Sequence, residues 1–112
     1  NMAYWRLTTY TRPDTDTEFY IRRTVAEVKT ASVIGGKIIE LENAGKITNY
    51  SIHYSEDLLK QYVKIGFDTE SSYNEFKTYC ESQAEYTTLK GDFKTNNSII
   101  ESTSESAEEP TV

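Results

Sequence analysis

The chain has 112 residues, which is enough for one domain with a modest core. Apolar residues make up 37% of it and aromatic residues 12%, with nine tyrosines, a composition that excludes a disordered protein and indicates a small core with an amphipathic margin. The net charge of −6 is uneven, because residues 101–112 hold four glutamates and no base, which leaves −2 on residues 1–100 (−6 less −4) and argues against a surface built to bind phosphates.

The single cysteine, Cys80, excludes an intrachain disulfide. We find no secretion signal and no apolar stretch long enough to span a membrane. These features predict a cytoplasmic protein with no membrane partner.

Residues 3–10, AYWRLTTY, alternate between two faces and are rich in aromatic and β-branched side chains, which predicts a strand. The more apolar face, which we assign to the core, holds Ala3, Trp5, Leu7 and Thr9. The other face holds Tyr4, Arg6, Thr8 and Tyr10. The turn residues 12–14 end the strand, and residues 14–23 fit either a loop that packs onto the core or the entry to a helix.

A capping box at Thr24–Glu27 predicts the start of a helix, because the threonine can accept from the amide three residues on. Gly35 and Gly36 interrupt the helical spacing at a cost of about 2 kcal/mol relative to alanine. Either the helix ends at these glycines or it continues because another backbone packs close to them. We favour one helical region over 25–44, kinked at the glycines and ended by residues 43–45.

Residues 47–54 and 61–68 alternate again across a short polar connection, which predicts an antiparallel hairpin with one face in the core. The spacing then changes to that of a helix, with Tyr73, Phe76, Tyr79 and Cys80 on one stripe and Asp68 or Thr69 as the cap. Residues 84–100 fit a short helix or a short final strand equally well. Residues 101–112 are acidic and low in complexity, so we interpret them as a flexible tail.

This order of elements predicts an α+β, ferredoxin-like (split βαβ) domain over residues 1–100, with helices on one face of an antiparallel sheet and the other face open. Phe67, the Asp68–Glu70 turn and a helix carrying Tyr73 and Phe76 resemble the second half of the dimeric α/β-barrel superfamily, which includes antibiotic-biosynthesis monooxygenase-like proteins. The opening MAYWRLTTYTRP and the segment FDTESSYNEF are similar to small uncharacterised proteins of marine bacteriophages and environmental sequence collections. The second resemblance implies a ferredoxin-like domain with no established activity, in a host cytoplasm if a phage encodes it.

The open face of the predicted sheet carries the candidate ligand or interface residues. On the face assignment above they are Tyr4, Arg6, Asn49, Ser51, His53, Tyr62 and Lys64. Aromatic and arginine side chains are enriched at interface cores, so a homodimer interface is the first interpretation. A small-molecule pocket against a partner and stacking of single-stranded nucleic acid are the alternatives. Leu58 and Leu59 at the hairpin tip either fold back on the core or contact a partner.

No residue set predicts catalysis, a metal site or a cofactor. His53 is the only histidine, and the face assignment separates it from Cys80. Neither GxxxxGK[ST] nor GxGxxG spacing occurs.

The first hypothesis is therefore a non-enzymatic interaction or accessory protein that forms a homodimer through its sheet face or binds another protein. The alternatives are a small-molecule-binding or oxygenase-like dimeric α/β-barrel protein and, third, a single-stranded nucleic-acid binder. An oxygenase of that kind needs tryptophan, histidine or asparagine inside an apolar cavity.

Overall fold

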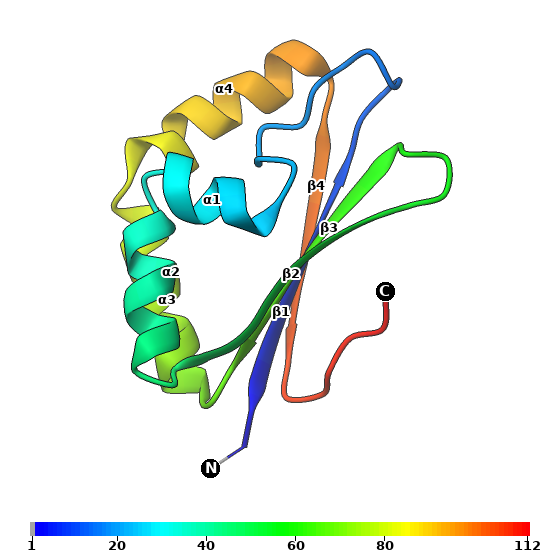
Figure 1. Ribbon diagram of the computed structural model, residues 1–112. Helices are drawn as coiled ribbons and strands as arrows, with labels where there is room; N and C mark the ends of the chain where they lie inside the picture. Colours follow the sequence, from blue (N-terminus) through cyan, green and yellow to red (C-terminus); the bar gives the residue numbers. More distant parts are fainter. Residues whose placement is uncertain (1) are drawn as a thin grey trace.

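The computed structural model describes residues 2–112 and contains one antiparallel sheet. Its strands are β1 (Tyr4–Thr11), β2 (Ile47–Tyr54), β3 (Lys60–Phe67) and β4 (Ile100–Ser106), in the order β2-β3-β1-β4. The helices are α1 (Val25–Ala31), α2 (Gly35–Asn43), α3 (Glu70–Glu81) and α4 (Thr88–Asn97), with a 3-10 turn, η1 (Ala84–Tyr86). All of them lie on one side of the sheet, so the predicted ferredoxin-like arrangement is confirmed (Figure 1).

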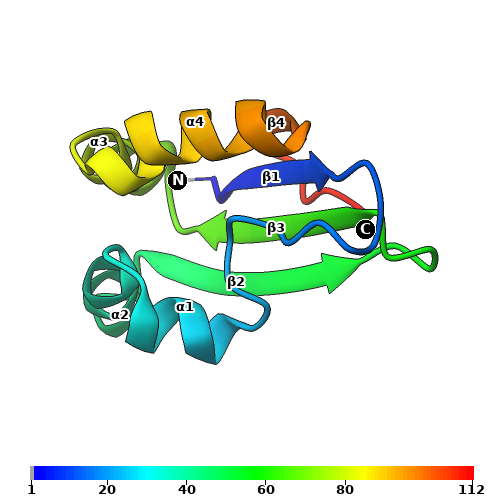
Figure 2. The same ribbon diagram turned by 90° about the horizontal axis from the view of Figure 1, so that it is seen from above.

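The helices form two groups over the sheet. Figure 2 shows α1 and α2 alongside β2, and α4 alongside β1 and β4. The core lies between these helices and the sheet, and its largest fully buried side chains include Tyr73, Phe67, Phe76, Ile38 and Leu41. Phe67 and Tyr73 meet with ring centroids 5.4 Å apart, which ties the end of β3 to the helix that follows it.

Strand β1 presents the opposite faces from those predicted. Thr8 and Tyr10 are 3% and 4% exposed, and the ring of Tyr4 lies 5.3 Å from that of Tyr73 on α3. The side chains of Trp5 and Leu7 therefore point away from the helices, onto the uncovered side of the sheet. We call this side the open face. The prediction was wrong because it assigned the more apolar face of β1 to the core.

A bulge in β2 sets the faces of that strand. Ile47 pairs with Phe67 and Asn49 with Gly66, so Thr48 is the extra residue. Ile47 is buried, whereas Thr48 and Asn49 are both exposed. Tyr50 and Ile52 then pack against the core, as the alternation predicted.

The predicted helical region 25–44 is two helices, because Ser32 has extended backbone angles (φ −111°, ψ 157°) and ends α1. The predicted cap at Thr24 is present: its Oγ1 accepts from the amide of Glu27 at 3.2 Å. A Cβ at Gly35 would lie 2.1 Å from the carbonyl oxygen of Lys29, so only glycine fits there. The predicted stop is also present, since Gly45 has φ +72° after the end of α2.

The C-terminal part of the chain differs from the predicted flexible tail. Residues 84–97 form η1 and α4, and Ile100–Ser106 form β4 at the edge of the sheet, paired with β1 along its length. The tail prediction for 101–112 therefore has to be corrected, because residues 101–106 are part of the sheet. The remaining residues turn back along the open face, where Glu109 lies 2.7 Å from Lys64 (Figure 1).

Residues 12–24 form neither a helix nor a strand but a segment fastened to the sheet. Arg12 donates to the carbonyls of Leu58 and Thr17, both at 2.8 Å, and its guanidinium lies over the ring of Phe19. Gln61 on β3 is fully buried and donates to the carbonyl of Ile21 at 3.3 Å. Of the two interpretations of this segment, the loop that packs onto the core is the one observed.

The two adjacent glycines of α2 make a matched test of the close approach. We expect Gly35→Ala to lower the free energy of unfolding by about 2 kcal/mol, because the carbonyl of Lys29 cannot move away without distorting α1. Gly36→Ala has open space around the new Cβ and should be neutral or stabilising by about 0.5 kcal/mol. Urea unfolding of both variants measures the difference, and equal effects would contradict the close contact.

Candidate functional site

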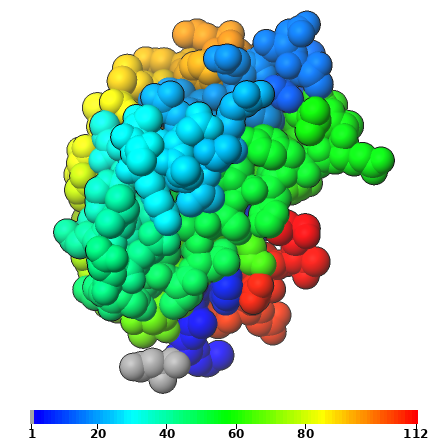
Figure 3. Space-filling model, viewed as in Figure 1, coloured from blue at the N-terminus to red at the C-terminus, as the bar shows by residue number. Residues whose placement is uncertain are grey.

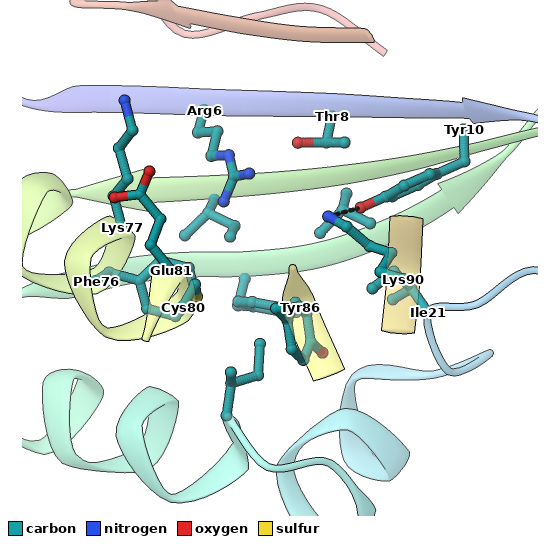
Figure 4. A pocket seen from close by; sticks show the side chains of 14 residues that line it. Arg6, Thr8, Tyr10, Ile21, Phe76, Lys77, Cys80, Glu81, Tyr86 and Lys90 are labelled. Carbon is teal, nitrogen blue, oxygen red and sulfur yellow. Dashed lines mark hydrogen bonds between the residues drawn. The ribbon is translucent and has the colours of Figure 1, made fainter. Parts of the chain in front are cut away.

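A cavity of about 120 Å³ lies between the helix side of the sheet and the helices. Its sheet wall holds Arg6, Thr8 and Tyr10 of β1, Tyr50 of β2, and Val63 and Ile65 of β3. Its other walls hold Ile21, Ile34, Phe76, Lys77, Cys80, Glu81, Tyr86 and Lys90 (Figure 4). The lining combines apolar side chains with hydroxyls and a few charges, which is the usual composition of a small-molecule site.

Arg6 extends from the middle of β1 into this space (Figure 4). Its Nε is buried and has no hydrogen-bond partner within residues 2–112. Buried polar groups in native proteins are nearly always paired, so an unpaired guanidinium nitrogen in a cavity calls for an explanation.

At the other end of the cavity, Lys90 belongs to a cluster that satisfies it. Its Nζ donates to the hydroxyl of Tyr10 at 3.2 Å and to Glu101 Oε2 at 3.3 Å, and Lys94 contacts the other oxygen of Glu101 at 2.5 Å. Burial lowers the pKa of Lys90, although Glu101 opposes that shift. Burial also acts to raise the pKa of Glu101, but the bond from Lys94 and the charge of Lys90 outweigh it, and the net pKa is lowered.

The hydroxyl and thiol groups of the cavity wall stay protonated at neutral pH. Burial raises the pKa of Tyr86 to about 12 and that of Cys80 to about 11, and it raises the pKa of Tyr10 and Tyr50 as well. A protonated thiol is a poor nucleophile, so Cys80 packs as a small apolar side chain.

The seven predicted open-face residues divide between the two sides of the sheet. Five of them share the open face: Asn49, Ser51, His53, Tyr62 and Lys64. Ser51 links two of these, through Asn49 Oδ1 at 3.1 Å and His53 Nε2 at 3.0 Å. The placement of Tyr4 and Arg6 was wrong. Both lie on the helix side, because the faces of β1 are reversed.

Trp5 takes their place on the open face. Its ring lies across Gly66, where a Cβ would come within 2.6 Å of it, and the ammonium of Lys64 is 5.3 Å from the ring centroid. Leu7 and Tyr62 are half-buried on the same face. The open face therefore has an aromatic and apolar centre, with polar residues of β2 and serines of β4 on either side.

The hairpin tip projects from the body of the molecule (Figure 3). Leu58 is 51% exposed and has φ +63°, while Leu59 is partly buried. Asp57 holds this turn by accepting from the amide of Leu59 at 3.0 Å and the hydroxyl of Ser55 at 2.7 Å. Leu58 thus does not fold back on the core, and partner contact stays a prediction for this pair.

Sequence reasoning missed the cavity residues Thr8, Tyr10, Tyr50, Tyr86 and Lys90 as a site. The available signal was the repeat Tyr-x-Arg-x-Thr-x-Tyr along β1, in which every second side chain carries both apolar and polar atoms. Residues 2–112 contain no group of His, Cys, Asp or Glu side chains placed to hold a metal ion. None of the helices in that range is long and apolar enough to cross a membrane.

No family model and no curated protein matches the sequence. Two solved dimeric ferredoxin-like proteins from uncultured marine organisms resemble the structure. The first has a TM-score of 0.65 and 17% identity, and the match covers 95% of this chain and 94% of that protein. The second has a TM-score of 0.62 and 10% identity, and the match covers 100% of this chain and 94% of that protein. A monooxygenase from Streptomyces coelicolor, solved in complex with nanaomycin D, has a TM-score of 0.59 and 10% identity and covers 99% and 91%.

These likenesses and the strand order define the chain as a protein of the ferredoxin-like α+β fold. Both resemblances seen in the sequence are confirmed at the level of the fold, since the neighbours include marine environmental proteins and a monooxygenase.

The Lys90–Glu101 cluster predicts that replacing the carboxylate of Glu101 by an amide will lower the stability of the fold strongly. We expect Glu101→Gln to lower the free energy of unfolding by about 3 kcal/mol at pH 7, because it leaves two lysines without their shared counter-ion in a largely buried position. Glu109→Gln, which removes the acid of a more exposed pair, should cost less than about 1 kcal/mol.

The pH dependence gives a second readout for the same pair of variants. The folded-state pKa of Glu101 lies below its unfolded value of 4.5, so its contribution is complete above pH 4.5 and is lost as the pH falls through the folded pKa. The stability difference between the wild type and Glu101→Gln should therefore shrink in urea titrations at pH 3. A difference that stayed constant would contradict an ionised Glu101.

Proposed function

We propose that this protein binds a small organic molecule in the cavity beneath its helices and functions as a homodimer through its open face. The observation that carries the binding proposal is the cavity itself, lined by apolar side chains and three tyrosines, with an unpaired guanidinium nitrogen within it. A dry apolar cavity of about 150 Å³ is known to accept benzene, so a cavity of about 120 Å³ limits the enclosed part of a ligand to one ring or less.

The cavity lining supports binding more than oxygenase chemistry. Such chemistry was expected to need Trp5 and His53 in one cavity, and both lie on the open face instead. The structural neighbour that is a monooxygenase binds nanaomycin D, which supports a ligand-binding role on this fold without assigning its reaction to this chain.

The open face supports self-association. The more apolar side of β1, with Trp5 and Leu7, is the side that no helix covers, and Tyr62 continues it onto β3. Aromatic side chains at the centre of a surface with a polar rim are typical of interfaces. Two of the structural neighbours are dimeric. The charge of this face also favours a protein partner over nucleic acid, because Lys64 is already paired with Glu109.

A cavity-filling variant tests the binding proposal. Cys80→Met adds atoms to the cavity wall, so we expect the free energy of unfolding to stay the same or to rise by up to about 2 kcal/mol. We also expect the variant to lose the binding of single-ring compounds. Thermal shift and calorimetry with phenol and benzamide measure both effects. Binding that survives in the variant, or no binding by the wild type, would contradict the proposal.

Light scattering tests the homodimer. We expect a wild-type molar mass of twice the 12.9 kDa of one chain, and a folded monomer for Tyr62→Asp, which places a charge at the centre of the open face. The matched control is Leu89→Asp, a similar change at an apolar residue of α4 that is 50% exposed on the helix side, and it should stay dimeric. A monomeric wild type would refute self-association, and a monomer in both variants would place the interface elsewhere.

A further inference from the structure

Arg6 carries a positive charge and forms no ion pair with any described residue, and its neighbour across β4, Glu105, is bound to Tyr73 and Lys77 instead. No ion pair within residues 2–112 includes Arg6, and its buried Nε has no hydrogen-bond partner. An arginine carries five N–H donors in a rigid fork and stays charged at any physiological pH. A buried guanidinium nitrogen without a hydrogen-bond partner is costly, and the chain keeps this one at the wall of a cavity.

The other cations at the cavity are already paired. Lys90 is bound to Glu101 and to the hydroxyl of Tyr10, and Lys77 lies 3.7 Å from Glu105. Glu81 is the one carboxylate among the lining residues, and it lies beside Lys77 on α3, where it is exposed (Figure 4). Arg6 therefore remains as the lining cation that a ligand can neutralise.

The charge of Arg6 reaches several groups in the cavity wall. Burial raises the pKa of Tyr10 and Tyr50, and the charge of Arg6 acts in the opposite direction on both. The same opposition holds at Cys80. A negative charge in the cavity would be attracted by this field, which is strong where water is excluded.

The apolar side chains that line the cavity suit a flat apolar body. Ile34 and Phe76 come from the helix side and Ile65 from the sheet, so apolar atoms face the cavity from both layers. A ligand with an anionic head and a single ring would place its head on Arg6 and its ring among these side chains.

We propose that the ligand of the cavity is a small carboxylate of single-ring size, whose two oxygens accept the paired N–H groups of Arg6. This inference rests on the proposed ligand-binding function and adds the chemical class of the ligand. A carboxylate matches the planar fork of a guanidinium with two parallel hydrogen bonds, and such charge-assisted bonds are among the stronger ones in proteins. The bound anion would at the same time remove the cost of the unpaired charge.

Calorimetry with benzoate and benzamide tests this assignment, because the two probes have nearly the same shape and differ in charge. We expect the wild type to bind benzoate about tenfold to a hundredfold more tightly than benzamide. Arg6→Gln should abolish that preference by weakening benzoate binding to the same extent, while benzamide binding changes little.

Lys64→Gln is the matched control. It removes the same charge from the same sheet, but on the open face, so it should leave the benzoate preference of the wild type unchanged. Melting temperatures without ligand show whether each variant is folded, and we expect Arg6→Gln to be no less stable than Lys64→Gln because Arg6 has no partner to lose.

The outcomes separate the two proposals. If benzamide binds as tightly as benzoate, or if Arg6→Gln keeps the preference for benzoate, the carboxylate assignment is wrong and the small-molecule site stands. If neither probe binds the wild type, both proposals fail. A fall in melting temperature for Arg6→Gln alone, with unchanged benzoate affinity, would give Arg6 a structural role and overturn the assignment.

Discussion

Strand β1 lies between β3 and β4, and its two-residue alternation decides what each side of the molecule can do. Pairing on both edges leaves the strand no freedom to rotate, so Tyr4, Arg6, Thr8 and Tyr10 must all face the helices once any one of them does. The same constraint places Trp5, Leu7 and Thr9 on the open face. One strand thus supplies both the wall of the cavity and the centre of the candidate interface.

Charged side chains in a cavity wall need partners of opposite charge, and the two ends of this cavity differ in whether the protein supplies such a partner. At one end Glu101 accepts from Lys90 and Lys94, which joins β4 to α4 through a largely buried carboxylate. Because β4 is an edge strand with mostly exposed side chains, this cluster is one of its few attachments to the helices. At the other end Arg6 forms no ion pair within residues 2–112. We therefore assign the Lys90–Glu101–Lys94 cluster to the stability of the fold and Arg6 to the proposed binding of a ligand.

The hairpin and the helix after it could be predicted from the sequence, because their core faces carry aliphatic and aromatic side chains at clear periods. Val63, Ile65 and Phe67 alternate, and Tyr73 and Phe76 follow at helical spacing. The faces of β1 could not be predicted in the same way. Its buried side faces a polar cavity, so it is built from tyrosine, threonine and arginine, which resemble a solvent-facing side when no partner layer is known.

Strand β4 escaped prediction for a different reason. An edge strand buries little surface, so its sequence has no hydrophobic alternation to detect. Its inward residues are Glu101, paired with lysines, Thr103, whose hydroxyl lies 3.3 Å from that of Thr8, and Glu105, which accepts from the hydroxyl of Tyr73. Its outward positions are largely serines. The candidate site was also hidden, because Lys90 and Tyr86 come from a segment that fitted a helix and a strand equally well.

The position of Trp5 has a spectroscopic consequence. It is the only tryptophan in the chain, and its indole lies on the open face between Gly66 and the ammonium of Lys64. Fluorescence excited at the red edge of the absorption band, where tyrosines do not absorb, therefore reports on that one face. The cavity is lined by tyrosines and no tryptophan, so it does not contribute to this emission. The molecule therefore carries an optical label for its open face without any substitution.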